Sequence, residues 1–384
     1  KDAIQEASQI YIELKKLGAA MGHIDVGGGL GIDYDGSQTA SNASTNYSLQ
    51  NYANDVVATI KECCKANRIE DPIIVSESGR AIVSHFSILL FNILGSDVKE
   101  SSISNIKKNE SILIQNLRDT LESINKLKQK SLIEGAEIQE AWNDAIKFKE
   151  DVLTAFRLGY IRLEERAIAE QLTWACAHAL IEVLPKCISI PKDLKQLPTT
   201  LSRIYYANLS VFRSTPDAWA IDQLFPIMPI HRLTEKPNIL GHFADITCDS
   251  DGKISKFIDQ NDEKKLLELH DLNDGEEYII GIFLGGAYQE SMGNLHNLFG
   301  STNSVHISVL DSGESGGYQV DHVIRGDTKS DVLKYMQHKP EEILERVRLA
   351  SEEAIQKGNL EISDARQLID HFETSLRQNT YLHE

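Results

Sequence analysis

Two polar motifs in this chain follow short apolar segments that the sequence predicts to be strands. Three consecutive glycines, residues 27–29, come directly after segment 21–26, and Glu77 and Arg80 come directly after segment 73–75. Glycines at the end of a strand allow a phosphate to approach the backbone, because no Cβ atom blocks the N–H groups. A carboxylate and a guanidinium three residues apart could bind a ligand that has both a cationic nitrogen and a phosphate. The plain alternatives are a tight turn and a surface ion pair.

Two further motifs lie later in the chain and carry a thiol and a phenol. Cys248 and Asp249 lie in the turn-like segment 246–252, and Tyr288 follows the small residues 285–287. The acidic turn faintly resembles the start of a calcium loop but lacks the closing glutamate, and a zinc site lacks partner residues. The tyrosine hydroxyl could reach a phosphate, whereas an aromatic residue at the end of a strand is the plain alternative.

The composition excludes several classes of partner. The 384 residues include 39 Lys and Arg against 57 Asp and Glu, a net charge of −18, and no basic stretch is long enough to bind a nucleic acid. No apolar run approaches the roughly 18 residues of a membrane-spanning helix. Five cysteines without CxxC spacing predict neither a disulfide framework nor a zinc site, so we expect a reducing, cytoplasmic compartment. The glycine run also lacks the patterns typical of ATP and NAD sites.

The order of predicted elements indicates an α/β unit followed by helical, β and helical regions. Helices over 1–18 and 49–67 alternate with strands over 21–26 and 73–75, as in a domain with a parallel sheet. We expect strand 73–75 to be buried. Helix 1–18 is predicted to bury one stripe of side chains, namely Ile4, Ala7, Ile10, Tyr11 and Leu14. Two strands alone would leave sheet edges open, so we expect further strands upstream of Lys1.

The rest of the chain divides by its pattern of apolar and turn residues. Segment 101–184 predicts a helical hairpin or small bundle, and segment 201–310, with turn signals every 8 to 12 residues, predicts an antiparallel β domain. Segment 330–381 is again helical, with Pro340 near a helix start. The stripe predicted for the first of these regions is Ile106, Ile112, Leu113, Leu117, Leu121, Ile124 and Leu127.

Taken together in this order, the four motifs resemble those of the fold-type III pyridoxal-phosphate decarboxylases, and more closely those of the biosynthetic arginine decarboxylase family of bacteria and plants. The likeness covers essentially the whole chain and is most specific in segments 24–36, 76–81, 208–210, 216–219 and 294–300. It implies an α/β plus β fold in four parts. These are the later part of a TIM-like (β/α)8 barrel with a crossover strand over 1–95, an inserted helical bundle over 96–190, an antiparallel β-sandwich or barrel domain over 191–325, and a C-terminal helical domain over 326–384.

The resemblance also implies a set of site residues around pyridoxal 5'-phosphate. The phosphate contacts would be Gly27, Gly28, Gly29, Gly79, Arg80 and Tyr288. Glu77 would face the pyridine nitrogen and keep it protonated, so that the ring can accept electrons. Cys248 would donate a proton and Asp249 would contact the distal end of the substrate, both across the interface of a homodimer with shared active sites. Further substrate contacts are expected from Asp25, Leu30, Gly31, Asp33, Tyr34, Asp217 and Asp222.

Three points remain at the level of the resemblance. None of the lysines lies in a setting like that of the family's cofactor-anchoring lysine, so we expect that residue upstream of Lys1. Magnesium is expected only because family members are often described as using it, and no set of metal ligands in the sequence supports it independently. A tetramer is the alternative to the dimer.

The activity implied by the resemblance is the conversion of L-arginine to agmatine and CO₂, for polyamine (putrescine and spermidine) biosynthesis. The ornithine-type enzymes have an aspartate soon after a Tyr-Tyr-x-Asn stretch, where this chain has Leu209. Asp217 and Asp222 are the candidates to replace it, because a planar guanidinium prefers a bidentate carboxylate. The alternatives are a catalytically inactive regulatory partner, or a decarboxylase of ornithine, lysine or diaminopimelate.

Overall fold

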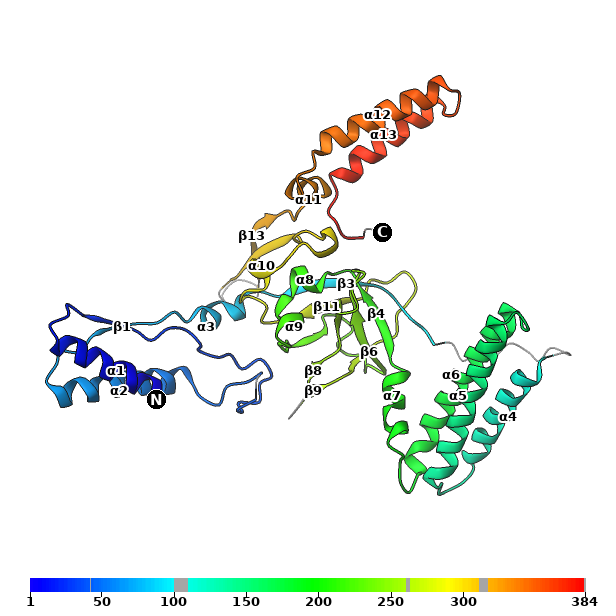
Figure 1. Cartoon of the computed structure of the whole chain (residues 1–384), viewed down its shortest axis with the longest axis horizontal. Helices are drawn as coiled ribbons and strands as arrows, with labels where there is room; N and C mark the ends of the chain where they lie inside the picture. The colour runs from blue at the N-terminus through cyan, green and yellow to red at the C-terminus, as the bar shows by residue number, and fades with distance from the viewer. Residues whose placement is uncertain (42, 100–109, 260–262, 311–316, 383–384) are drawn as a thin grey trace.

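The computed structural model describes residues 1–41, 43–99, 110–259, 263–310 and 317–382. Figure 1 shows a small α/β unit, a central sheet, a helical bundle and a helical C-terminal region, and the other three groups extend from the sheet in different directions. None of the helices in these ranges is both long enough and apolar enough to cross a membrane.

The N-terminal group pairs two helices with two parallel strands. The elements are α1 (Asp2–Lys16), β1 (His23–Asp25), α2 (Leu49–Asn67) and β2 (Ile73–Val75). Their shared core consists of apolar side chains, namely Tyr11, Ile12, Ile24, Val56, Ile60 and Cys64. The hydroxyl of Ser48 caps the start of α2, and Arg68 in the left-handed conformation ends it. The helices and strands predicted for this region are confirmed.

Two expectations about burial in this group are wrong. Ile10 and Leu14 of α1 are exposed, whereas Ile12, which the predicted stripe omits, is fully buried, because Tyr11 and Ile12 supply the side chains that pack in the shared core. Strand β2 is not buried either, since Ile73 is 62% exposed. Among the described strands β2 pairs only with β1, and Ile74 is its residue that packs against the core.

Three long helices form the bundle: α4 (Ile112–Leu127), α5 (Gly135–Arg157) and α6 (Leu163–Val183). Their buried side chains recur at helical spacing and include Ile114, Leu117, Ile124, Ile138, Val152, Leu172, Cys176 and Leu180. Burial raises the pKa of the Cys176 thiol to about 12, so this cysteine packs as a small apolar residue. The prediction of a small helical bundle is confirmed for the described residues, although Ile112 of the predicted stripe is exposed and Ile106 lies outside the described residues.

Among the described residues, the central sheet has seven strands in the order β10-β6-β4-β3-β11-β5, with β7 also paired to β6. The strands are β3 (Leu89–Ser96), β4 (Arg203–Ala207), β5 (Ile227–Pro229), β6 (Ile239–Ala244), β7 (Lys253–Ile254), β10 (Leu267–Leu269) and β11 (Ile279–Ile282). The expectation of an antiparallel β domain is confirmed for the other pairs of this sheet, but β4 and β6 are parallel. The connection between them contains α8 (Val211–Ser214), α9 (Pro216–Ala220) and β5, and it is long enough to return the chain to the same end of the sheet.

The bundle is inserted between two neighbouring strands of this sheet. Strands β3 and β4 pair antiparallel on either side of the insertion, with Ile93 opposite Ala207. At its base, Lys99 Nζ donates to the carbonyl oxygens of Thr200 and Ser202 at 2.8 and 2.7 Å. An insertion whose two ends are held this close leaves the pairing of the flanking strands intact.

The remaining elements are short or belong to the C-terminal region. The short helices are α3 (Gly79–Val83), α7 (Leu197–Thr200) and α10 (Gln289–Met292), and the strands are β8 (Phe257–Ile258), β9 (Glu263–Lys264), β12 (Ser304–Val309) and β13 (Tyr318–Ile324). The C-terminal helices are α11 (Lys329–Tyr335), α12 (Pro340–Gln356) and α13 (Ile362–Leu376). Short 3-10 helices lie at η1 (Ser84–Phe86), η2 (Leu184–Lys186), η3 (Asp193–Gln196) and η4 (His296–Leu298). Pro340 begins α12, as the sequence predicts.

Replacing Leu172 by Ala is expected to destabilise the bundle by about 2 to 5 kcal/mol, because the change leaves a cavity among fully buried neighbours. Leu163→Ala is the matched control in the same helix, at a side chain that is 66% exposed, and should cost less than about 0.5 kcal/mol. Urea unfolding followed by the fluorescence of Trp142 and Trp174, which lie on α5 and α6, measures both effects. Equal shifts of the two midpoints would contradict the assignment of the buried face of α6.

Candidate functional site

The glycine turn and the Glu77 segment lie side by side because β1 and β2 are parallel neighbours. Beyond the paired residues, Val26 N–H donates to Val75 O and Glu77 N–H donates to Gly27 O, both at 2.9 Å. A Cβ atom on Gly28 would lie 2.8 Å from the Glu77 carbonyl oxygen, so glycine is required at this close approach. The Glu77 side chain is exposed and has no ionic partner among the described residues. Two motifs far apart in the sequence therefore form one polar edge at the carboxyl ends of the strands.

The glycine turn leaves backbone donors free. Gly27 and Gly29 have φ of 70° and 85°, in the region that favours glycine. Gly27 N–H donates to Asp25 Oδ1 at 2.7 Å, whereas the N–H groups of Gly28, Gly29 and Leu30 donate to no other residue within the described part of the chain. Successive free N–H groups in a turn of this kind form a site for an anion such as a phosphate.

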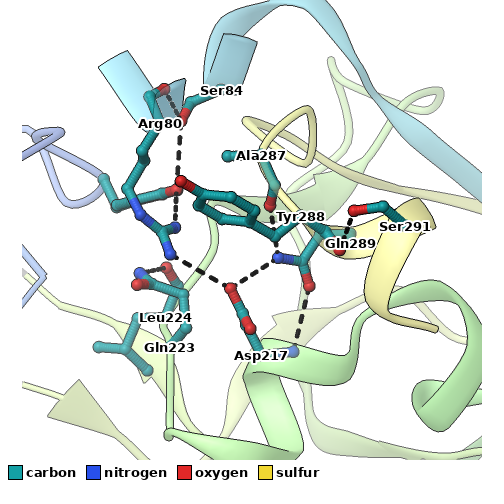
Figure 2. Close-up of polar contacts among 10 residues, drawn as sticks. Arg80, Ser84, Asp217, Gln223, Leu224, Ala287, Tyr288, Gln289 and Ser291 are labelled. Carbon is teal, nitrogen blue, oxygen red and sulfur yellow. Dashed lines mark hydrogen bonds and ion pairs between the residues drawn. The ribbon is translucent and has the colours of Figure 1, made fainter. Parts of the chain in front are cut away.

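Arg80 lies among three segments of the chain, and Figure 2 shows its contacts. Its Nη1 donates to Tyr34 OH at 2.8 Å, and its Nη2 lies 3.4 Å from Asp217 Oδ2. The guanidinium carbon lies 5.0 Å from the centroid of the Tyr288 ring. Burial opposes the charge of Arg80, but hydrogen bonding and attraction from Tyr34 and Asp217 outweigh it and raise the pKa of Arg80 above its ordinary value. The Tyr288 hydroxyl lies 3.2 Å from where a Gly79 Cβ would be, beside the Glu77 segment.

Asp217 is held in a buried network on α9. Gln289 Nε2 donates to Asp217 Oδ2 at 2.9 Å and to Ala287 O at 2.8 Å, and Asp217 N–H donates to Gln289 Oε1 at 3.2 Å. Asp217 is 4% exposed and pairs with the guanidinium of Arg80, and its contact with a substrate stays a prediction. Sequence reasoning assigned no role to Gln289, because nothing in its local sequence distinguishes it from a surface glutamine.

Asp222 is the more accessible of the two candidate acids. Its carboxylate pairs with Lys256 Nζ at 3.0 Å and is largely exposed. It lies at a cavity of about 240 Å³ that is also lined by Trp219, Asp251 and Lys253. A carboxylate in this position can exchange its exposed lysine partner for a cationic ligand at little cost.

The segment after the glycine turn makes most of its hydrogen bonds within residues 31–47. Leu30 and Tyr34 are buried, and Asp33 Oδ1 accepts a hydrogen bond from Ser44 at 2.7 Å. Gly31 N–H donates to Tyr47 OH at 3.0 Å. These contacts occupy residues that we expected near the substrate, and their contact with a substrate stays a prediction.

Cys248 and Asp249 lie at the tip of the loop between β6 and β7. Cys248 is exposed, its N–H donates to Asn297 Oδ1 at 3.1 Å, and its Sγ accepts from Asn297 Nδ2 at 3.4 Å. Asp249 Oδ2 lies 3.7 Å from His296 Nε2. The sequence predicted the Cys-Asp pair but assigned no role to His296 or Asn297, although both lie in segment 294–300 that carried part of the resemblance.

The structure thus forms two polar groups rather than one. No hydrogen bond or ion pair between described residues joins the Cys248 loop to the group around Arg80. Within the same residues, no cluster of three or more His, Cys, Asp or Glu side chains is arranged to hold a metal ion. Magnesium therefore stays an expectation from the resemblance alone.

Three family models match separate parts of the chain. Residues 1–84 match the pyridoxal-dependent decarboxylase, pyridoxal binding domain; residues 107–198 match the arginine decarboxylase helical bundle domain; and residues 330–382 match the arginine decarboxylase C-terminal helical extension. The first match sets the class, because residues 1–84, which include the glycine turn, match the pyridoxal-binding domain of pyridoxal-dependent decarboxylases.

Whole-chain comparisons are more specific. The chain is 63% identical over 382 residues to a biosynthetic arginine decarboxylase of Prochlorococcus marinus (strain MIT 9303), and 59% identical over 384 residues to one of Parasynechococcus marenigrum (strain WH8102). The solved structure of the biosynthetic arginine decarboxylase of Campylobacter jejuni covers 100% of the chain with 32% identity and a TM-score of 0.80. The chain therefore carries arginine decarboxylase domains over residues 107–198 and 330–382 and is similar to biosynthetic arginine decarboxylases over its whole length. It spans 58%, 59% and 60% of the lengths of these three relatives.

Replacing Asp217 by Asn should lower the free energy of unfolding by about 1 to 3 kcal/mol, because it leaves a half-buried guanidinium without its anionic partner. Asp222→Asn is the matched control, since its ion pair with Lys256 is exposed and should contribute less than about 1 kcal/mol. Chemical denaturation of the two variants beside the parent measures the difference. An equal loss in both would show that burial does not strengthen the pair with Arg80.

Proposed function

We propose that this chain belongs to an enzyme that decarboxylates L-arginine to agmatine and CO₂ with pyridoxal 5'-phosphate, in polyamine biosynthesis. The observation that carries the proposal is the identity of 63% over 382 residues to a relative named biosynthetic arginine decarboxylase. The geometry supports it, because a turn with three N–H groups and a carboxylate, all without a partner among the described residues, lie side by side at the ends of two parallel strands.

The residues present fit the cofactor. The N–H groups of Gly28, Gly29 and Leu30 and the hydroxyl of Tyr288 would bind the phosphate, and the positive charge of Arg80 lies close behind that phenol. Glu77 would hold a proton on the pyridine nitrogen. When bound, the cofactor supplies an electron sink for the bond to the departing carboxylate.

The substrate contacts that we propose come from two directions. Asp222 lines an accessible cavity and carries an exchangeable partner, so it is a candidate for the guanidinium of arginine. Cys248, as the proton donor, and Asp249, as a substrate contact, would enter the site of a partner subunit, which agrees with their separation from the Arg80 group. A homodimer with shared sites in the cytoplasm is therefore part of the proposal, with a tetramer as the alternative.

Two competing functions are less well supported. A regulatory partner without catalysis has no chemical need for an unpaired Glu77 beside the glycine turn and an exposed Cys248 next to Asp249. A diaminopimelate decarboxylase would need a basic residue for the distal carboxylate. The cavity beside Asp222 is lined by Lys253 and Lys256 as well as by acids, so the preference for arginine rests on the identity to relatives named biosynthetic arginine decarboxylase.

The full-length enzyme should release CO₂ from arginine in preference to ornithine, lysine and diaminopimelate.

Gly28→Ala should weaken cofactor binding by at least about tenfold, because the added Cβ displaces the Glu77 segment. Gly22→Ala is the matched control, since its Cβ would meet no atom within 4 Å. Cofactor titration by absorbance and CO₂ release measure both effects, and release from ornithine but not from arginine would contradict the proposal.

Mixing Cys248→Ala subunits with Glu77→Ala subunits tests the shared site. Each variant alone should be nearly inactive, whereas an equal mixture should recover about a quarter of the parent activity, since half of the dimers carry one intact site. Mixing Cys248→Ala with parent subunits gives the control for subunit exchange. No recovery despite exchange would show that Cys248 and Glu77 serve the same subunit's site.

A further inference from the structure

The loop that carries Cys248 is held rigidly from its own side. Asp245 N–H donates to Gly252 O at 2.8 Å and closes the loop. The buried Asp245 carboxylate accepts from Thr247 N–H and the Thr247 hydroxyl at 2.8 and 2.7 Å, and from Val211 N–H at 2.9 Å. These contacts fix the backbone on both sides of Cys248, and none of the described hydrogen bonds within the loop involves its side chain.

The missing contact comes from Asn297, in the turn η4. The backbone N–H of Cys248 can only donate, so the Asn297 oxygen must face it at 3.1 Å. With the oxygen in that place, Asn297 Nδ2 faces Cys248 Sγ and donates a hydrogen bond to it at 3.4 Å. One side chain therefore makes a hydrogen bond to both the backbone and the thiol of Cys248. The orientation of the amide is fixed, because the Cys248 N–H requires the amide oxygen on its side.

The backbone of the turn is suited to this role. Asn297 has φ 52° and ψ 23°, the left-handed region in which asparagine is favoured among residues with a side chain. The ring centroid of the neighbouring His296 lies 4.4 Å from that of Phe212. Its Nε2 is buried, has no hydrogen-bond partner within the described part of the chain, and points toward Asp249. Two consecutive residues of the turn thus face two consecutive residues of the loop.

We infer that Asn297 is a positioning residue for Cys248, which it orients and whose thiolate it stabilises through the amide N–H. The inference rests on the proposed role of Cys248 as the proton donor. In that step the S–H bond breaks, a C–H bond forms at the substrate carbon, and the electron pair stays on sulfur as a thiolate that later takes a proton from water. A donor aimed at the sulfur stabilises that thiolate and leaves the thiol proton directed away from Asn297.

Asn297→Asp separates this role from a merely structural one. An aspartate keeps the acceptor for Cys248 N–H and tolerates the left-handed backbone, but it replaces the donor at the sulfur with an anion. We expect iodoacetamide to alkylate Cys248 about threefold to tenfold more slowly at pH 8 in the full-length variant, as measured by mass spectrometry of the Cys248 peptide. Asn303→Asp is the matched control, because Asn303 also accepts from a backbone N–H, at Gly326, and carries no thiol contact.

The outcomes are distinguishable from a loss of folding. Unfolding would expose the buried Cys64 and Cys176 to alkylation, so slower labelling at Cys248 while these two cysteines stay unlabelled supports the inference. A rate equal to that of the parent in Asn297→Asp would overturn it. Asn297→Gly, which keeps the backbone but removes both contacts, should also label more slowly, provided that the two buried cysteines stay unlabelled.

A kinetic measurement separates this inference from the proposed function. In the full-length holoenzyme, Asn297→Asp should lower kcat for arginine about tenfold or more with little change in KM. If the parent does not decarboxylate arginine, the proposed function fails while the labelling result still stands. If the parent is active and both labelling and kcat of Asn297→Asp are unchanged, only the inference about Asn297 fails.

Discussion

The guanidinium of Arg80 is the contact on which the arrangement of the candidate site depends. It joins the segment after the glycine turn, through Tyr34, to α9 of the central sheet region, through Asp217, and to the start of α10, through the Tyr288 ring. A planar group with five donors can serve several partners at once, which a lysine ammonium could not do with the same geometry. Because Arg80 and Asp217 are largely buried, this pair is screened less than an exposed pair such as Lys1 with Asp55.

The insertion of the helical bundle leaves this arrangement undisturbed. The bundle leaves the sheet after β3 and returns at β4, and these strands pair directly, with Asn208 N–H donating to Asn92 O at 3.0 Å just beyond the paired residues. The bundle has a separate core of its own, so its packing does not depend on that of the sheet. The residues of the candidate site come from the segments before and after the bundle, and none of them lies in it.

Sequence reasoning succeeded where the decisive interactions are local. Helix α2 has the predicted bounds, because its apolar period, the cap at Ser48 and the left-handed Arg68 all lie within one continuous segment. It failed for the face of α1 and for β2, whose burial depends on which other elements lie against them. It also failed for the pairing of β4 with β6, since a single strand has the same residue pattern in a parallel and an antiparallel pair.

By itself the sequence determined the reactive side chains and the glycine turn, because glycine conformations and strand ends depend on near neighbours. Only the tertiary structure decided what each group contacts. Asp217 was predicted as a candidate contact for the guanidinium of the substrate, and the fold in addition pairs it with the guanidinium of Arg80, far away in the chain. Likewise, Asn297 is an ordinary turn residue until the loop between β6 and β7 brings Cys248 against its amide. The physical reason is that hydrogen bonds and ion pairs require contact distances, and contacts between distant segments are set by the packing of the whole chain.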